Sequence, residues 1–92
     1  MNVTIIVSAA LRRYVDNAEQ LSVDSAGTVA AALAELTGRF PKLGAQLFAP
    51  SGKLRGFILV FVNARNIKQL QQEQTVLADG DQIRLVPAIA GG

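Results

Sequence analysis

The chain has 92 residues, 50% of them apolar and 17% charged, so it is long enough for one compact domain and too apolar for intrinsic disorder. It contains no cysteine and no histidine, which excludes disulfides, thiol nucleophiles, imidazole bases and the usual zinc ligand sets. Nine Lys and Arg residues against seven Asp and Glu residues give a net charge of +2. The basic residues are scattered along the sequence, which argues against nucleic-acid binding.

The sequence has no segment typical of membrane insertion or export. Its longest apolar runs, residues 29–34 and 57–62, are six residues each, whereas a membrane-spanning helix needs about 20. Arg12 and Arg13 follow the apolar N-terminal run, although a signal peptide carries its positive charges first. We therefore expect a cytoplasmic protein.

The N-terminal segment has the pattern of a β-hairpin with a long loop. Residues 3–8 are apolar at odd positions and mostly polar at even positions, which is the period of a half-buried strand, with Ile6 pointing outward. Residues 21–23 repeat the alternation after a polar stretch, and Ser25-Ala26-Gly27 ends that second strand.

A helix is predicted after this hairpin. Thr28 can cap it, because its hydroxyl can accept a hydrogen bond from the first helical turn. Apolar side chains then recur at intervals of three and four residues, at Val29, Leu33, Leu36 and Phe40. We expect Gly38 to form the C-terminal cap and Pro41 to prevent continuation. Residues 41–48 are predicted to form a second, short helical turn.

The C-terminal half contains two further predicted strands. Residues 57–62 are continuously apolar and are followed by a turn over residues 63–66. Residues 68–74 are interpreted as a solvated loop with Leu70 tucked inward. Asp79-Gly80-Asp81 is a strong turn signal, because glycine adopts positive φ without steric cost. This turn precedes a predicted strand over residues 82–86, in which Ile83 and Leu85 face the core. We expect Pro87 to end the strand, because it has no N–H group to donate.

The order of elements is strand, strand, helix, strand and final strand, with room for a short strand before the last. One main helix on one face of a small mixed sheet is an α+β layout, and this order is that of the β-grasp fold. We expect one domain over residues 1–87 and a flexible tail over residues 88–92.

The tail is the most informative part of the sequence. Ala88, Ile89 and Ala90 have no core pattern, and the chain finishes in Gly91 and Gly92. Five extended residues reach about 17 Å at ~3.4 Å each, enough to thread into a partner's active site. A terminal carboxylate without a side chain fits a narrow channel, but it is a poor electrophile when ionised. The chain has no residue that could activate it, so Gly92 is predicted to be a substrate that a partner adenylates with ATP. The competing interpretation is an incidental, frayed terminus.

Residues 77–92 resemble the C-terminus of the MoaD/ThiS family of ubiquitin-like sulfur carriers. The turn at 79–81, the final strand, Pro87 and the diglycine end all match, and the resemblance extends over nearly the whole chain. It implies a non-catalytic carrier that binds no cofactor itself. It also implies a thiocarboxylate on Gly92, made by an E1-like adenylating enzyme that uses ATP.

Within that family the length, the 51–55 loop and the 87–92 end look most like the sulfur carrier of cysteine biosynthesis. The implied sulfur acceptor is then a pyridoxal-phosphate cysteine synthase. Three alternatives stay open: the small subunit of molybdopterin synthase, working with its large subunit; a protein modifier joined to lysine; and a plain β-grasp binding module.

The strand patterns also predict a surface for partners. Ile6, Arg84 and Val86 should point away from the helix. Residues 57–62 are apolar at odd-numbered and at even-numbered positions, so one of the two sets should share that outer side. The two sets are Phe57, Leu59 and Phe61, and Ile58, Val60 and Val62. We assign the second set, together with Ile6, Arg84 and Val86, to a candidate partner face; a covering loop is the alternative.

Other charged residues give weaker signals. The spacing of Asp79 and Asp81 around Gly80 favours a turn over a catalytic carboxylate pair, and no metal site is predicted. Four basic residues could steer an acidic partner, but a solvated polar face is the better explanation of them: Lys53, Arg55, Arg65 and Lys68.

Overall fold

The computed structural model of the protein describes residues 2–24 and 27–88. Its elements in chain order are β1 (Val3–Val7), η1 (Ala9–Tyr14), β2 (Gln20–Val23), α1 (Val29–Arg39), α2 (Pro41–Leu47), β3 (Ile58–Val62), β4 (Arg65–Asn66), η2 (Ile67–Gln69), η3 (Gln72–Gln74) and β5 (Gln82–Pro87). Ser25 and Ala26, expected to end the second strand, lie outside the described residues.

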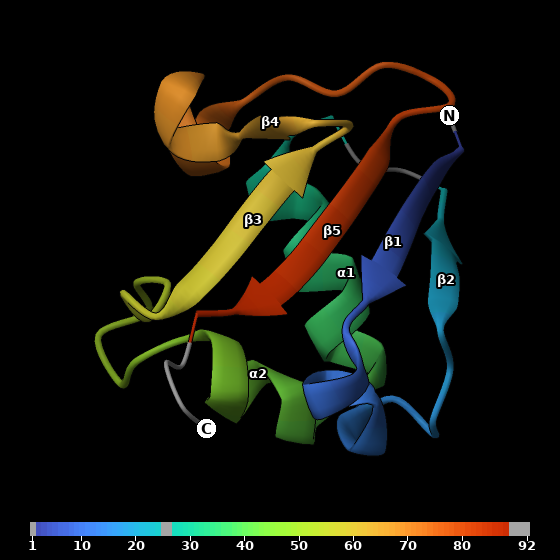
Figure 1. Ribbon diagram of the computed structural model, residues 1–92, viewed down its shortest axis with the longest axis vertical. Helices are drawn as coiled ribbons and strands as arrows, with labels where there is room; N and C mark the ends of the chain where they lie inside the picture. Colours follow the sequence, from blue (N-terminus) through green and yellow to red (C-terminus); the bar gives the residue numbers. More distant parts are fainter. Residues whose placement is uncertain (1, 25–26, 89–92) are drawn as a thin grey trace.

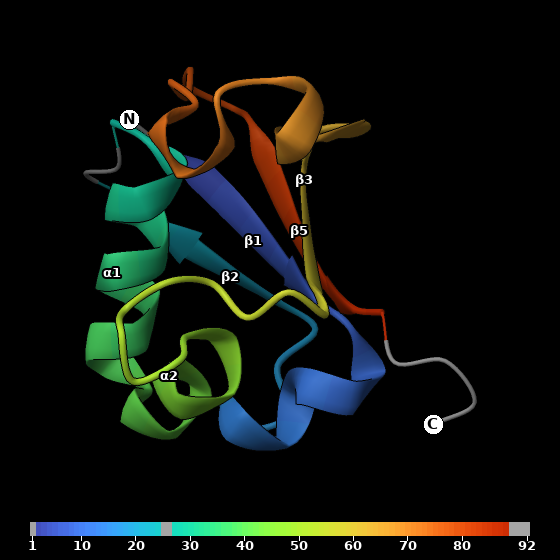
Figure 2. The same ribbon diagram turned by 90° about the vertical axis from the view of Figure 1, so that its left-hand side faces the viewer.

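The five strands form one mixed sheet in the order β2-β1-β5-β3-β4. β1 is antiparallel to β2 and parallel to β5, whereas β3 is antiparallel to both β5 and β4. Figure 1 shows the sheet with the helices behind it, and Figure 2 shows α1 and α2 packed on one side. The predicted α+β class and β-grasp fold are confirmed.

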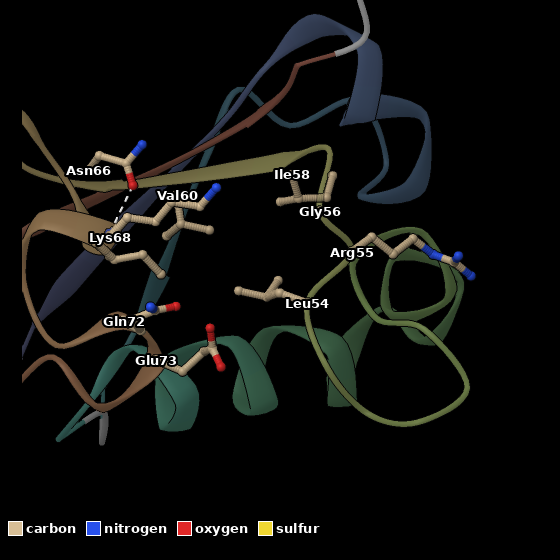
Figure 3. A pocket seen from close by; sticks show the side chains of 10 residues that line it. Leu54, Arg55, Gly56, Ile58, Val60, Asn66, Lys68, Gln72 and Glu73 are labelled. Atoms are coloured by element: carbon tan, nitrogen blue, oxygen red, sulfur yellow. Dashed lines mark hydrogen bonds between the residues drawn. The ribbon is translucent and has the colours of Figure 1, made fainter.

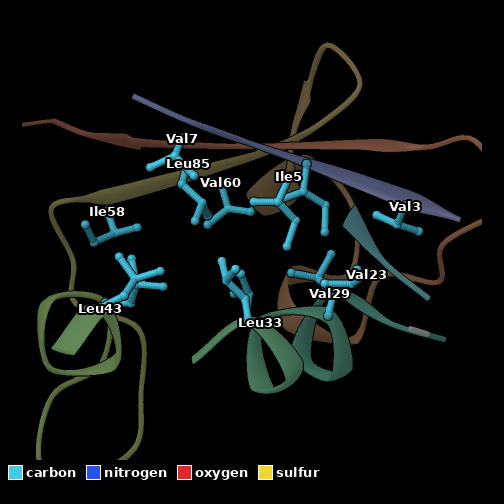
Figure 4. Close-up of a cluster of buried hydrophobic side chains, with 14 of the residues drawn as sticks. Val3, Ile5, Val7, Val23, Val29, Leu33, Leu43, Ile58, Val60 and Leu85 are labelled. Atoms are coloured by element: carbon cyan, nitrogen blue, oxygen red, sulfur yellow. The ribbon is translucent and has the colours of Figure 1, made fainter. Parts of the chain in front are cut away.

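The hydrophobic core lies between the sheet and these helices. Alternate residues of β1, β3 and β5 are buried, and Figure 4 shows them facing Leu33 of α1 and Leu43 of α2. Ile83 and Leu85, predicted to face the core, are fully buried. The period of two along each strand therefore separates a core side of the sheet from an outer side.

The first helix begins as predicted but ends differently. The Thr28 hydroxyl accepts a hydrogen bond from the Ala31 amide at 3.2 Å, which confirms the N-terminal cap. The prediction of Gly38 as C-terminal cap is wrong, because α1 continues to Arg39 and Phe40 is the capping residue. Phe40 has a φ of −128° and donates its amide to Leu36, and no left-handed residue is needed, since Pro41 starts α2 immediately afterwards.

Regular structure also occurs where loops were expected. Residues 9–14 form the 3₁₀ helix η1, which buries Leu11, in place of an open hairpin loop. Arg65 and Asn66, assigned to a turn, form β4 and pair with the end of β3. Short 3₁₀ segments have no periodicity that sequence patterns can detect.

The turn before β5 holds three distant parts of the chain together. The carboxylate of Asp79 accepts the Asn2 amide at 2.6 Å. The carboxylate of Asp81 accepts the Ala78 amide at 2.8 Å and the Asn63 side-chain amide at 3.1 Å. Both acids are therefore occupied by structural hydrogen bonds, as the turn interpretation predicted.

Replacing Gly80 by alanine is expected to destabilise the fold by about 1–2 kcal/mol, because Gly80 has a φ of +87° and an L-residue is strained there. No atom lies within 4 Å of the Cβ that would be added, so the cost is conformational and not steric. Gly56 is the matched control, since it has equal space and no positive φ. Urea unfolding should separate Gly80→Ala from Gly56→Ala; equal midpoints would contradict the account.

Candidate functional site

The last described residues form the root of the C-terminal tail. β5 ends at Pro87, which pairs with Ile58, and the Ala88 amide then donates to the Phe57 carbonyl. The ladder between β3 and β5 thus holds Ala88, which is exposed at the end of the sheet. The other predicted tail residues, Ile89, Ala90, Gly91 and Gly92, lie outside the described residues.

The side of the sheet turned away from α1 and α2 is the outer face. Ile6 and Val86 are half-buried there, and Arg84 is exposed, as the alternation predicted. The register places Arg84 between Ile6 of β1 and Phe61 of β3, and it sets Val86 opposite Leu59. Cross-strand partners share a face, so these five residues make one continuous surface.

The assignment of Ile58, Val60 and Val62 to the partner face is wrong. These side chains are only 5%, 2% and 6% exposed, and they belong to the core. The reason is the register, which pairs Val60 with Leu85 and Val62 with Ile83. Since Leu85 and Ile83 point inward, their cross-strand partners must do so too.

The residues of this segment that do lie on the outer face are the odd-numbered ones, the other set that the sequence allowed. Leu59 and Phe61 are half-buried on β3, and Phe57, just before the strand, is 41% exposed. The alternation of the last strand could have found them only together with the register of its pairing with β3, which the sequence does not give. We define the outer face by Ile6, Phe57, Leu59, Phe61, Arg84 and Val86.

This face leads directly to the tail. Phe57 directly precedes β3 and accepts the hydrogen bond from the Ala88 amide. A protein that covers the apolar side chains would therefore also meet the tail at its root. On this face Phe57 is exposed and the other apolar side chains are half-buried, so a covering protein could bury them further.

The interior offers little room for chemistry. Figure 3 shows a cavity between β3 and the η2–η3 segment, bordered by Leu54, Ile58 and Val60, with Lys68 and Glu73 among its charged lining residues. Its volume of about 90 Å³ is well below the ~300–1,000 Å³ of typical ligand sites.

Within residues 2–24 and 27–88, no cluster of three or more acidic, histidine or cysteine side chains could hold a metal. Nor does a helix in those ranges have the length and apolarity to cross a bilayer.

Comparison with known proteins agrees with this geometry. A model of the ThiS family matches residues 5–92. The chain belongs to the ThiS family. This ThiS-family chain is 32% identical over 94 residues, covering 100% of both sequences, to the sulfur carrier protein CysO of Mycobacterium tuberculosis. The predicted membership of the MoaD/ThiS family is thereby confirmed.

Two solved structures are similar over nearly the whole chain. The crystal structure of SAMP1 from Haloferax volcanii has a TM-score of 0.87 and 28% identity, covering 100% of each chain. A chain of the Amycolatopsis orientalis BexX/CysO complex has a TM-score of 0.87 and 27% identity. The match covers 98% of this ThiS-family chain and 99% of the chain in that complex.

Proposed function

We propose that this ThiS-family chain carries sulfur as a thiocarboxylate on Gly92 and delivers it for cysteine biosynthesis. The observation that carries the proposal is the family match, which continues to the final glycine, together with full-length similarity to a sulfur carrier. In this role the chain is a protein substrate, and the catalytic groups and the ATP belong to its partners.

The chemistry proceeds in two steps. The Gly92 carboxylate attacks the α-phosphate of ATP on an E1-like enzyme, which forms an acyl-adenylate and releases pyrophosphate. A sulfide sulfur then attacks the acyl carbon and expels AMP, which leaves the thiocarboxylate. Adenylation is needed because an ionised carboxylate is a poor electrophile, and glycine suits the step because it lets the backbone approach closely.

The tail, residues 88–92, threads into the partner while the outer face docks. Fixing the backbone of one residue in a single conformation costs about 1–2 kcal/mol of entropy, so threading five residues requires docking to offset several kcal/mol. The apolar side chains of the outer face supply this when they are buried. The pyridoxal-phosphate cysteine synthase that accepts the sulfur has to meet the same tail root.

ATP–pyrophosphate exchange tests the adenylation step. The E1-like enzyme should catalyse exchange only when the full-length chain is present, because Gly92 is the group adenylated. Exchange at the same rate without the chain, or none with it, would refute the proposal.

Phe57→Ala is expected to raise the KM for the chain in this assay by about tenfold or more, because aromatic anchors carry much of the energy of protein interfaces. Val76→Ala is the matched control. Val76 is 71% exposed but lies on the segment that bridges to Thr28, away from the outer face. If both variants keep the wild-type KM, the outer face is not the docking surface.

A second candidate function is conjugation to lysine. The similarity to SAMP1, a small archaeal modifier protein, favours it. It requires the same activated Gly92, with an amine in place of sulfide as the nucleophile. Cleavage after Arg84 leaves residues 85–92 attached to a conjugated lysine. Mass spectrometry of tryptic lysine peptides that bear this eight-residue remnant distinguishes the two: remnants on other proteins support conjugation, and their absence supports a carrier.

A further inference from the structure

Arg84 is the charged residue of the outer face. Its neighbours across the strands are Ile6 and Phe61, and the outward residues before and after it on β5 are Gln82 and Val86. Within the described part of the chain the Arg84 side chain forms no hydrogen bond or ion pair. In contrast, Arg39 pairs with Glu35 at 2.7 Å, and the Nε atoms of Arg12 and Arg55 donate to backbone carbonyls.

A surface hollow of about 350 Å³ lies beside this arginine, lined by Phe61, Asn63, Ala64 and Arg84. Its polar neighbours are already engaged. The Asn63 side chain donates to Asp81 and accepts the Gln82 amide, and Asp81 also accepts the Ala78 amide. The exposed guanidinium of Arg84 is therefore the polar group at the hollow that no other part of the described chain engages.

We propose that the E1-like enzyme presents an aspartate or glutamate to Arg84, and that this carboxylate occupies the hollow when the outer face docks. The inference rests on the proposed function and adds the chemistry that selects the partner. Docking on the apolar neighbours removes water from Arg84. A desolvated guanidinium needs a carboxylate, which it can bind through two parallel N–H groups. The ring of Phe61 can pack against the methylene groups of the incoming acid.

Arg84→Met distinguishes this arrangement from a purely apolar interface, because the two arrangements predict changes of opposite sign in the KM for the chain. If a carboxylate faces Arg84, methionine leaves that acid buried without a partner, and the KM for the chain should rise at least about tenfold. If the facing surface is apolar, methionine removes an unpaired buried charge, and the KM should fall. A lower or an unchanged KM overturns the inference.

Arg84→Lys and Lys42→Met complete the test. Lysine keeps the charge but cannot form the bidentate hydrogen bonds of a guanidinium. The KM for the Arg84→Lys chain should therefore lie between those for wild type and Arg84→Met. Lys42 is exposed on α2, on the other side of the sheet, and removing its charge should leave the KM unchanged. An equal rise for Lys42→Met would mean that net charge alone matters, which also overturns the inference.

The salt dependence and kcat give independent readouts. The wild-type KM should rise with ionic strength more steeply than that of Arg84→Met, because only the wild type forms the ion pair. The kcat at saturating chain should be unchanged, since Arg84 does not touch the reacting atoms. Failure of the proposed function looks different: the wild-type chain itself would then support no pyrophosphate exchange.

Discussion

A chain that lacks Gly92 is expected to lose ATP-dependent activation almost completely, by at least about 100-fold in kcat/KM. The carboxylate then belongs to Gly91 and lies one residue, about 3.4 Å, short of its position in the partner's channel. Adenylation needs the reacting atoms to approach within about 3–3.5 Å, and a misplacement of even ~1 Å can cost 100-fold. Pyrophosphate exchange measures the loss.

The shortened chain should still fold normally. The buried core ends with Leu85, well before the deleted residue, so the thermal unfolding midpoint should match that of the full chain. Gly92→Ala is the companion variant, because it keeps the length and adds only a methyl group next to the carboxylate. It should be activated less well than wild type but better than the deletion. Wild-type activation of the shortened chain would contradict the donor role of Gly92.

Leu33→Ala is expected to have the largest effect on stability. Leu33 is fully buried on α1, where Figure 4 shows it between the helix and the sheet. Truncation of such a leucine costs about 3–5 kcal/mol through lost transfer energy and the cavity left behind. Alanine has the highest helix propensity, so the loss cannot come from the helix itself.

Chemical denaturation of Leu33→Ala measures this cost directly. A 92-residue domain has about 5–14 kcal/mol of total stability, so the variant should unfold at a much lower denaturant concentration. Ala34→Gly provides the control on the adjacent exposed position, with an expected cost of only about 1 kcal/mol from helix propensity. A loss for Leu33→Ala no larger than that of Ala34→Gly would contradict the assigned core.

The fold was largely predictable because apolar residues recur at regular intervals along its main strands and its main helix. The alternation at Val3, Ile5 and Val7 and the three- and four-residue spacing of α1 each allow one orientation of the element. The end of α1 was not predictable from Gly38, because Phe40 and Pro41 together stop the helix without a left-handed residue. The 3₁₀ segments were missed because they depend on packing of single residues such as Leu11.

The outer face was predictable only in part for a related reason. Ile6, Arg84 and Val86 lie on strands whose other side is plainly apolar, so their direction follows from alternation. Residues 57–62 are apolar on both sides, and only the pairing with β5 decides which set is buried. A strand that carries apolar side chains on both sides has no period in the sequence that reveals its buried side.

The proposed sulfur on Gly92 can be located by tandem mass spectrometry of the chain after reaction with the E1-like enzyme, ATP and a sulfide donor. We expect replacement of one oxygen atom by sulfur, confined to the C-terminal glycine and dependent on ATP. An unchanged Gly92, or sulfur attached at any other residue, would contradict the proposal.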